Sequence, residues 1–205
     1  MGYRTIRQRT DTSFTERRSE FIAYLAPVAT NDEAVAFINE IKAMHRKATH
    51  NVYAYIVRDN NISRYSDDGE PQGTAGVPVL DILHKHSLTD VCCVVTRYFG
   101  GILLGGGGLV RAYSTAAKLA VEKSCILNMC ECYKTQIVMD YNLYNKISYL
   151  LPQFEIKELS SDFGEMVRMD ILVKEQYFNA LSDKLTETSN GKVKIKKDQK
   201  LFENF

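Results

Sequence analysis

The sequence has no excess of charge of either sign. Its 205 residues include 26 Lys and Arg against 25 Asp and Glu, which gives a formal charge of +1. This balance argues against a protein held to nucleic acid or membrane by bulk positive charge, although it is compatible with a local basic patch. The sequence also lacks any run of about 18 apolar residues and an N-terminal secretion signal. We therefore expect a cytoplasmic protein without a transmembrane helix.

The number and spacing of the cysteines do not suit a metal site or a disulfide framework. The five cysteines form no C-x-x-C pair, and no histidine lies at ligand spacing from them. We therefore expect reduced structural thiols, no bound metal and no cofactor. Ser/His/Asp and Cys/His nucleophile patterns with recognisable local context are missing as well. A binding protein is thus favoured over an enzyme.

Strand and helix patterns alternate up to about residue 125. Apolar residues in 19–29 favour a strand, and the capping box formed by Thr30 and Glu33 predicts that a helix begins there. The unbroken apolar run at 91–96 is typical of a central strand covered on both faces. The other predicted elements are strands at 51–58 and 62–65 and helices at 74–86 and after residue 108.

From about residue 134 the pattern follows the order βαββαβ. This order is typical of the ferredoxin-like unit, in which two helices cover one face of a four-stranded antiparallel sheet. In the last predicted strand Lys192, Lys194 and Lys196 alternate with apolar residues, which favours a protected edge strand over an RNA-binding face. The chain is therefore predicted to be an α+β protein with domains at 1–130 and 131–205.

A glycine cluster directly follows the predicted strand at 91–98. Six of the 12 glycines fall within nine positions, namely Gly100, Gly101, Gly105, Gly106, Gly107 and Gly108. Such a turn lets backbone amides converge on an anion at a helix N-terminus, and Arg97 and Arg111 are candidates to bind the same anion. Neither the P-loop lysine nor G-x-G-x-x-G is present. The alternative is that glycine only permits a tight, closely packed turn.

An acidic loop precedes the predicted helix at 74–86. Asp67, Asp68 and Glu70 are candidates to hold a divalent cation or to act as acid and base, although such loops are often merely solvated. The amides of Gln72 and Thr74 at the helix start are candidates to meet an anion. The sequence indicates no partner for any of the four histidines.

Residues 67–78, 95–105 and 107–113 resemble the signature of the YigZ/IMPACT family. The resemblance implies that the N-terminal domain is similar to the second domain of a small-subunit ribosomal protein, an α+β sheet with helices on one face. It also implies that the C-terminal domain is similar to the last domain of elongation factor G. Both likenesses point to translation.

Two functional hypotheses follow from these features. The first is a translation-associated regulatory protein of the cytosol that binds RNA, the ribosome or a translation factor through the glycine turn with Arg97 and Arg111. The alternative is a hydrolase-like enzyme that acts on a small phosphorylated or nucleotide substrate, with a cation on the acidic loop. The enzyme hypothesis requires the acidic loop and the glycine turn to line one cleft.

Overall fold

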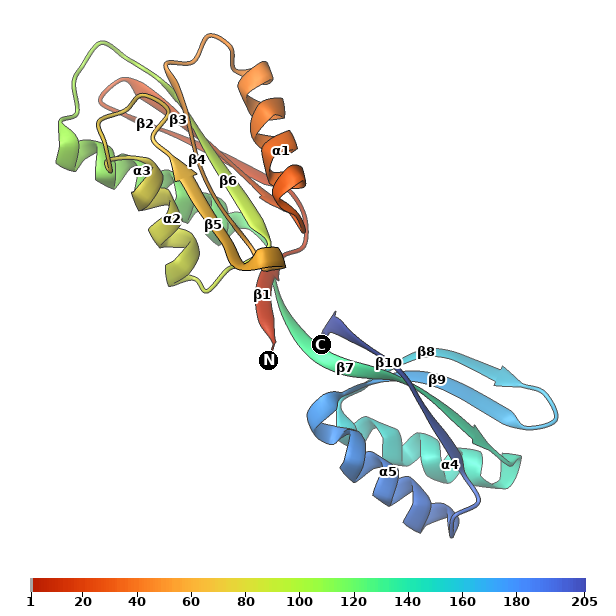
Figure 1. The fold of residues 1–205 in the computed structure, drawn as a ribbon. Helices are drawn as coiled ribbons and strands as arrows, with labels where there is room; N and C mark the ends of the chain where they lie inside the picture. Colours follow the sequence, from red (N-terminus) through yellow and green to blue (C-terminus); the bar gives the residue numbers. More distant parts are fainter. Residues whose placement is uncertain (1) are drawn as a thin grey trace. The chain divides into compact units, whose positions relative to one another are not determined.

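A computed structural model describes residues 2–205, which form two compact units. One unit is Tyr3–Leu127, and the other is Asn128–Phe205 together with Gly2. The division falls inside strand β7 (Ile126–Met139), as does the domain boundary expected after residue 130. Each unit combines helices with a sheet, which confirms the α+β fold class (Figure 1). No helix within residues 2–205 is long and apolar enough to cross a membrane.

The N-terminal unit is built on an antiparallel sheet in the order β2-β3-β6-β4-β5. Its strands are β2 (Thr10–Glu16), β3 (Ser19–Pro27), β4 (His50–Val57), β5 (Ile62–Ser66) and β6 (Val91–Tyr98), and the short strand β1 (Tyr3–Ile6) precedes them. Strand β2 lies at the edge of the sheet and carries mostly polar, partly exposed residues. It therefore has no apolar pattern from which it could be predicted.

Helices cover both faces of this sheet. Helix α1 (Asn31–Met44) shares one buried cluster with Cys92 and Val94 of β6, and helices α2 (Gly76–Lys85) and α3 (Gly106–Lys123) share the other with Cys93 and Val95. The expectation that the helices lie on one face is wrong. Successive side chains of a strand point to opposite faces, so the apolar run of β6 requires cover on both sides.

The start of α1 confirms the predicted capping box. The Thr30 hydroxyl accepts a hydrogen bond from the Glu33 amide at 3.2 Å, and the Glu33 carboxylate accepts one from the Ala29 amide at 2.6 Å. The first bond satisfies an amide that the helix leaves unpaired, and the second ties the residue before the N-cap to the first turn.

The C-terminal unit has the predicted βαββαβ order. Its antiparallel strands lie in the order β10-β7-β9-β8, and helices α4 and α5 pack on one core with them. Figure 1 shows both helices on the same side of the sheet. The elements are α4 (Tyr141–Leu150), β8 (Ile156–Phe163), β9 (Val167–Lys174), α5 (Glu175–Ser189) and β10 (Lys194–Asn204), and short turns of 3-10 helix occur at Asp59–Asn61 and Leu151–Phe154.

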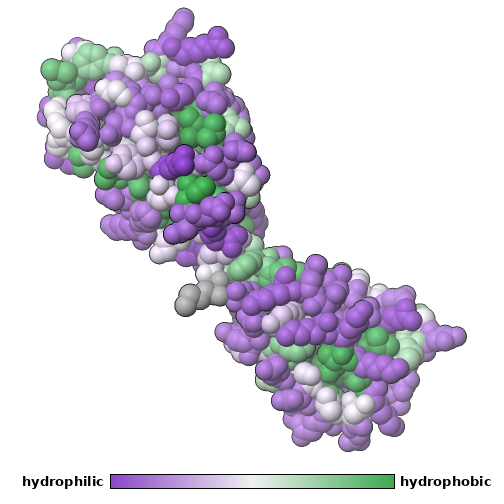
Figure 2. All heavy atoms as spheres, viewed as in Figure 1, coloured by the Kyte–Doolittle hydropathy of each residue, from purple (hydrophilic) through white to green (hydrophobic). Residues whose placement is uncertain are grey.

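The polarity of the surface and the burial of two cysteines agree with this packing. On the face drawn in Figure 2 hydrophilic residues predominate over both units. All five cysteines are free, as predicted. Cys92 and Cys93 lie in the core of the N-terminal unit, and burial raises the pKa of the Cys93 thiol to about 12.

Candidate functional site

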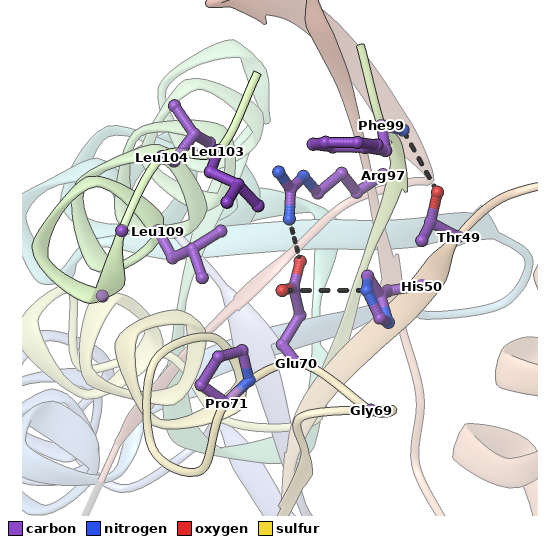
Figure 3. Close-up of a pocket in the computed structure, with 12 residues that line it drawn as sticks. Thr49, His50, Gly69, Glu70, Pro71, Arg97, Phe99, Leu103, Leu104 and Leu109 are labelled. Atoms are coloured by element: carbon purple, nitrogen blue, oxygen red, sulfur yellow. Dashed lines mark hydrogen bonds and ion pairs between the residues drawn. The ribbon is translucent and has the colours of Figure 1, made fainter. Parts of the chain in front are cut away.

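The candidate site is a pocket of about 410 Å³ in the N-terminal unit (Figure 3). We call it the Glu70 pocket. It lies between the start of β4, the end of β6, the acidic loop and the glycine turn. Its lining residues are Thr49, His50, Gly69, Glu70, Pro71, Arg97, Phe99, Leu103, Leu104, Gly105, Gly106 and Leu109. The structure thus brings part of the acidic loop and part of the glycine turn to one cleft.

A buried ion pair forms the floor of the pocket. Arg97 Nη1 and the Tyr113 hydroxyl both donate to Glu70 Oε1 at 2.7 Å, and the side chains of Glu70 and Arg97 are only 4% and 6% exposed. Burial and the adjacent Glu70 carboxylate raise the pKa of Tyr113, so its hydroxyl stays protonated and donates. The positive charge of Arg97, which the sequence assigned to an external anion, is balanced by Glu70 inside the fold.

His50 is the third polar group of the floor, and the sequence did not single it out. Its Nδ1 lies 2.8 Å from the backbone oxygen of Asp68, and because a carbonyl only accepts, Nδ1 carries the proton. Nε2 lies 3.7 Å from Glu70 Oε2, and Figure 3 shows the imidazole directed at the carboxylate. At 3.7 Å the two atoms form no direct hydrogen bond, and both residues line the pocket.

His45 also has partners that the sequence did not indicate. Its ring nitrogens lie 2.6 Å from the Tyr24 hydroxyl and 2.9 Å from the Tyr98 hydroxyl. Burial lowers the pKa of His45, which favours the neutral ring. The expectation that His45 and His50 lack partners is therefore wrong, because their partners come from distant strands and loops.

Asp67 is occupied in holding the start of α2. Its carboxylate accepts hydrogen bonds from the amides of Gly73, Ala75 and Gly76 at 2.8, 3.1 and 2.7 Å. These amides precede the helical hydrogen bonds, so Asp67 satisfies donors that α2 leaves free. Thr74 also turns inward, since its hydroxyl donates to the Pro71 carbonyl at 2.6 Å.

Asp68 and Gln72 lie apart from the floor of the pocket. Asp68 accepts from Lys42 Nζ and from the Asn51 amide, both at 2.7 Å, and Gln72 is exposed. The three carboxylates of the acidic loop thus bind three different sets of partners. No cluster of three or more potential metal ligands occurs among residues 2–205. The side chains of Asp67, Asp68 and Glu70 therefore do not converge on one point.

The glycines of the turn serve two different purposes. A Cβ at Gly100 would lie 1.9 Å from the Arg18 carbonyl oxygen, so close packing demands glycine there. Gly106 and Gly107 are exposed, and a Cβ on either would meet no atom nearer than 3.8 Å. Packing therefore explains Gly100, and a Cβ at Gly108 would lie only 3.1 Å from Leu104 Cβ, but packing leaves Gly106 and Gly107 unexplained.

Arg111 lines a second cavity, of about 350 Å³, beside this first turn. We call it the Arg111 cavity, and its lining residues are Phe14, Glu16, Arg17, Leu104, Gly108, Arg111, Ala112 and Thr115. Arg111 forms no ion pair with any residue in 2–205, and Arg17 lies 4.0 Å from Glu16. Of the two arginines that the sequence singled out, Arg97 lines the Glu70 pocket and Arg111 lines its neighbour.

Comparison with known proteins gives the family. The model described as the Impact N-terminal domain matches residues 17–121, and the one described as Domain of unknown function (DUF1949) matches 137–192. IMPACT family member YvyE of Bacillus subtilis is 40% identical over 97% of this chain and 92% of the relative, and IMPACT family member YigZ of Escherichia coli is 32% identical over 87% and 88%. A crystal structure described as a hypothetical protein is 29% identical, with a TM-score of 0.61 over 97% of this chain and 98% of that one. The chain belongs to the IMPACT family.

Proposed function

We propose that this protein is a cytoplasmic regulator of translation that binds RNA through the Arg111 cavity and the first turn of α3. Membership of the IMPACT family supports a translation-related regulatory role in general. The choice of RNA as the ligand comes from the chemistry of the cavity.

The observation that carries the proposal is the unpaired charge at the start of α3. The first helical hydrogen bond joins the Leu109 amide to the Gly105 carbonyl, so the amides of Gly106, Gly107 and Gly108 have no helical partner. No side chain caps this helix, and the guanidinium of Arg111 lies beside Gly107. Free amides at a helix N-terminus together with a guanidinium are the groups that bind phosphate oxygens.

RNA is favoured over a translation factor because the apolar side chains that line the Arg111 cavity are accompanied by two arginines and lie beside the free amides of α3. Arg17 adds a second positive charge, and Glu16 offsets one of the two. A cavity with this balance attracts a phosphate backbone without requiring a basic protein as a whole. Local positive charge of this kind is compatible with an overall charge of only +1.

The test is a titration of the protein with a short fluorescent single-stranded RNA, repeated across salt concentrations. We expect Arg111→Ala and Arg17→Ala to weaken binding for all sequences alike and to reduce the salt slope by about 1 for each phosphate that the variant no longer binds. Arg168→Ala is the matched control, because Arg168 is an exposed arginine on β9 of the other unit. The proposal fails if RNA does not bind at low salt or if the Arg111 and Arg17 variants bind as tightly as the control. Binding of a translation factor without RNA would favour the protein-binding alternative.

A further inference from the structure

We infer that the Glu70 pocket holds one unstacked nucleobase of the bound RNA and reads its hydrogen-bond donors, with guanine as the preferred base. This inference rests on the proposed function. It concerns the Glu70 pocket, whose lining shares only Leu104 with that of the Arg111 cavity, and it predicts base preference rather than affinity for phosphate.

Two polar atoms of the pocket floor, Glu70 Oε2 and His50 Nε2, form no hydrogen bond with residues 2–205. Glu70 Oε1 is satisfied by two donors, whereas Glu70 Oε2 accepts no hydrogen bond from any of residues 2–205. Its neighbour His50 Nε2 is 3.7 Å away, beyond hydrogen-bond distance, and is an acceptor when the ring is neutral. Both residues line the pocket, so a ligand inside it can reach these two atoms. A ligand that brings two N–H groups to this point satisfies both.

The charge of the floor favours a neutral ligand. Glu70 and Arg97 already balance each other within the buried pair. An ammonium group or a phosphate would therefore bring an uncompensated charge into a desolvated site, which is costly. A neutral ligand avoids this cost, so the donors are best supplied by an uncharged group.

The walls of the pocket have the size and composition that suit a nucleobase. The pocket volume of about 410 Å³ lies within the range of roughly 300–1,000 Å³ that small-molecule sites occupy. Apolar side chains of Pro71, Phe99, Leu103, Leu104 and Leu109 surround the polar floor. Phe99 is half exposed at the rim of the pocket. In RNA-binding proteins, unstacked bases stack on accessible aromatic side chains of this kind. A nucleobase offers apolar faces and a polar edge that match these walls and this floor.

Guanine fits the floor better than the other bases. Its Watson–Crick edge presents adjacent N–H donors from the ring and from the exocyclic amino group, whereas the edges of adenine, cytosine and uracil do not present two adjacent donors. Gly105 and Gly106 line the pocket where α3 begins, and Leu104 lines both the pocket and the Arg111 cavity. The Glu70 pocket, which would hold the base, therefore adjoins the Arg111 cavity, which would hold a neighbouring phosphate of the RNA.

The test compares short uridine-rich RNAs that differ at one position, which is guanine, inosine or adenine. Inosine lacks the exocyclic amino group of guanine and keeps its ring N–H. We expect guanine to bind about tenfold more tightly than adenine, with inosine between them. His50→Ala and Leu103→Asp should each abolish this preference. Leu103 is 81% exposed, so its substitution leaves the core intact, and Ile102→Asp is the control because Ile102 lies on the same loop but does not line the pocket.

A second measurement separates this inference from the proposed function. Guanosine and adenosine, which carry no phosphate, are titrated into the ¹⁵N-labelled protein while the amide signals of Gly69, Gly105 and Gly106 are followed. Selective shifts with guanosine support the pocket even if RNA binding fails. RNA binding that depends on Arg111 but shows no base preference, with no guanosine shifts, overturns the pocket inference and leaves the proposed function standing.

Discussion

The Glu70 pocket and the Arg111 cavity are neighbours, but they use arginine in opposite ways. In the pocket, Arg97 is buried and its charge is balanced by Glu70 at 2.7 Å. In the cavity, Arg111 is exposed, and no carboxylate of the described chain pairs with it. Both arginines flank the same glycine turn, so the sequence alone gives no reason to assign them different roles.

The difference shows which charges are available to a ligand. Breaking a buried pair leaves a desolvated charge without compensation, so such a pair is part of the fold. An exposed arginine beside free amides contributes little to stability and can bind an anion. We therefore expect the two sites to respond differently to mutation.

The largest effect is expected at Glu70. Glu70→Ala leaves Arg97 buried without its carboxylate and removes the acceptor of Tyr113. We expect the free energy of unfolding to fall by about 3–5 kcal/mol, measured by urea denaturation. The control is Glu40→Ala, which removes the exposed pair with Arg9 and should cost no more than about 1 kcal/mol. Equal losses in the two variants would show that the buried pair does not stabilise the fold.

The next largest effect is expected at Gly100. A Cβ there would overlap the Arg18 carbonyl at 1.9 Å, so Gly100→Ala forces the turn away from the β2–β3 hairpin. We expect a loss of about 1–3 kcal/mol in the free energy of unfolding, as for other overpacked sites. A neutral result would mean that the turn shifts freely and that the glycine is not there for packing.

A smaller effect on stability is expected at Gly107, and it has the opposite sign. Gly107 lies inside the first turn of α3, and a Cβ would meet only Arg111 Nη1 at 3.8 Å. Gly107→Ala should therefore raise the free energy of unfolding by up to about 1 kcal/mol, because alanine favours helix over glycine. If the glycine serves a bound phosphate, the same variant weakens RNA binding while thermal unfolding moves to higher temperature. An unchanged affinity of this variant for RNA would show that Gly107 is not part of the binding site.

Much of the fold could be predicted because its signals are local. Thr30 and Glu33 lie close enough in sequence to indicate the start of α1, and β6 has the apolar run of a strand covered on both faces. The run indicated helices on both faces of the sheet, whereas the family resemblance implied helices on one face. The structure has helices on both faces. Strand β2 escaped prediction because an edge strand needs few apolar residues.

The site was less predictable because its pairs are distant in sequence. Glu70 lies 27 residues from Arg97 and 43 from Tyr113, and no local rule joins them. The cluster of acids and the cluster of glycines did locate the two loops that meet at the pocket. They did not reveal that Asp67 caps a helix, nor that a single histidine, His50, completes the floor.

The most direct test of this difference between the arginines is to measure unfolding and RNA binding in parallel for two variants. Arg97→Met keeps the apolar stem and removes the charge, and we expect it to lose about 3–5 kcal/mol of unfolding free energy. Arg111→Ala should unfold within about 0.5 kcal/mol of the wild type yet bind RNA more weakly, with a salt slope lower by about 1. The opposite roles of the two arginines are contradicted if Arg111→Ala binds RNA as tightly as the wild type, or if Arg97→Met is as stable as the wild type.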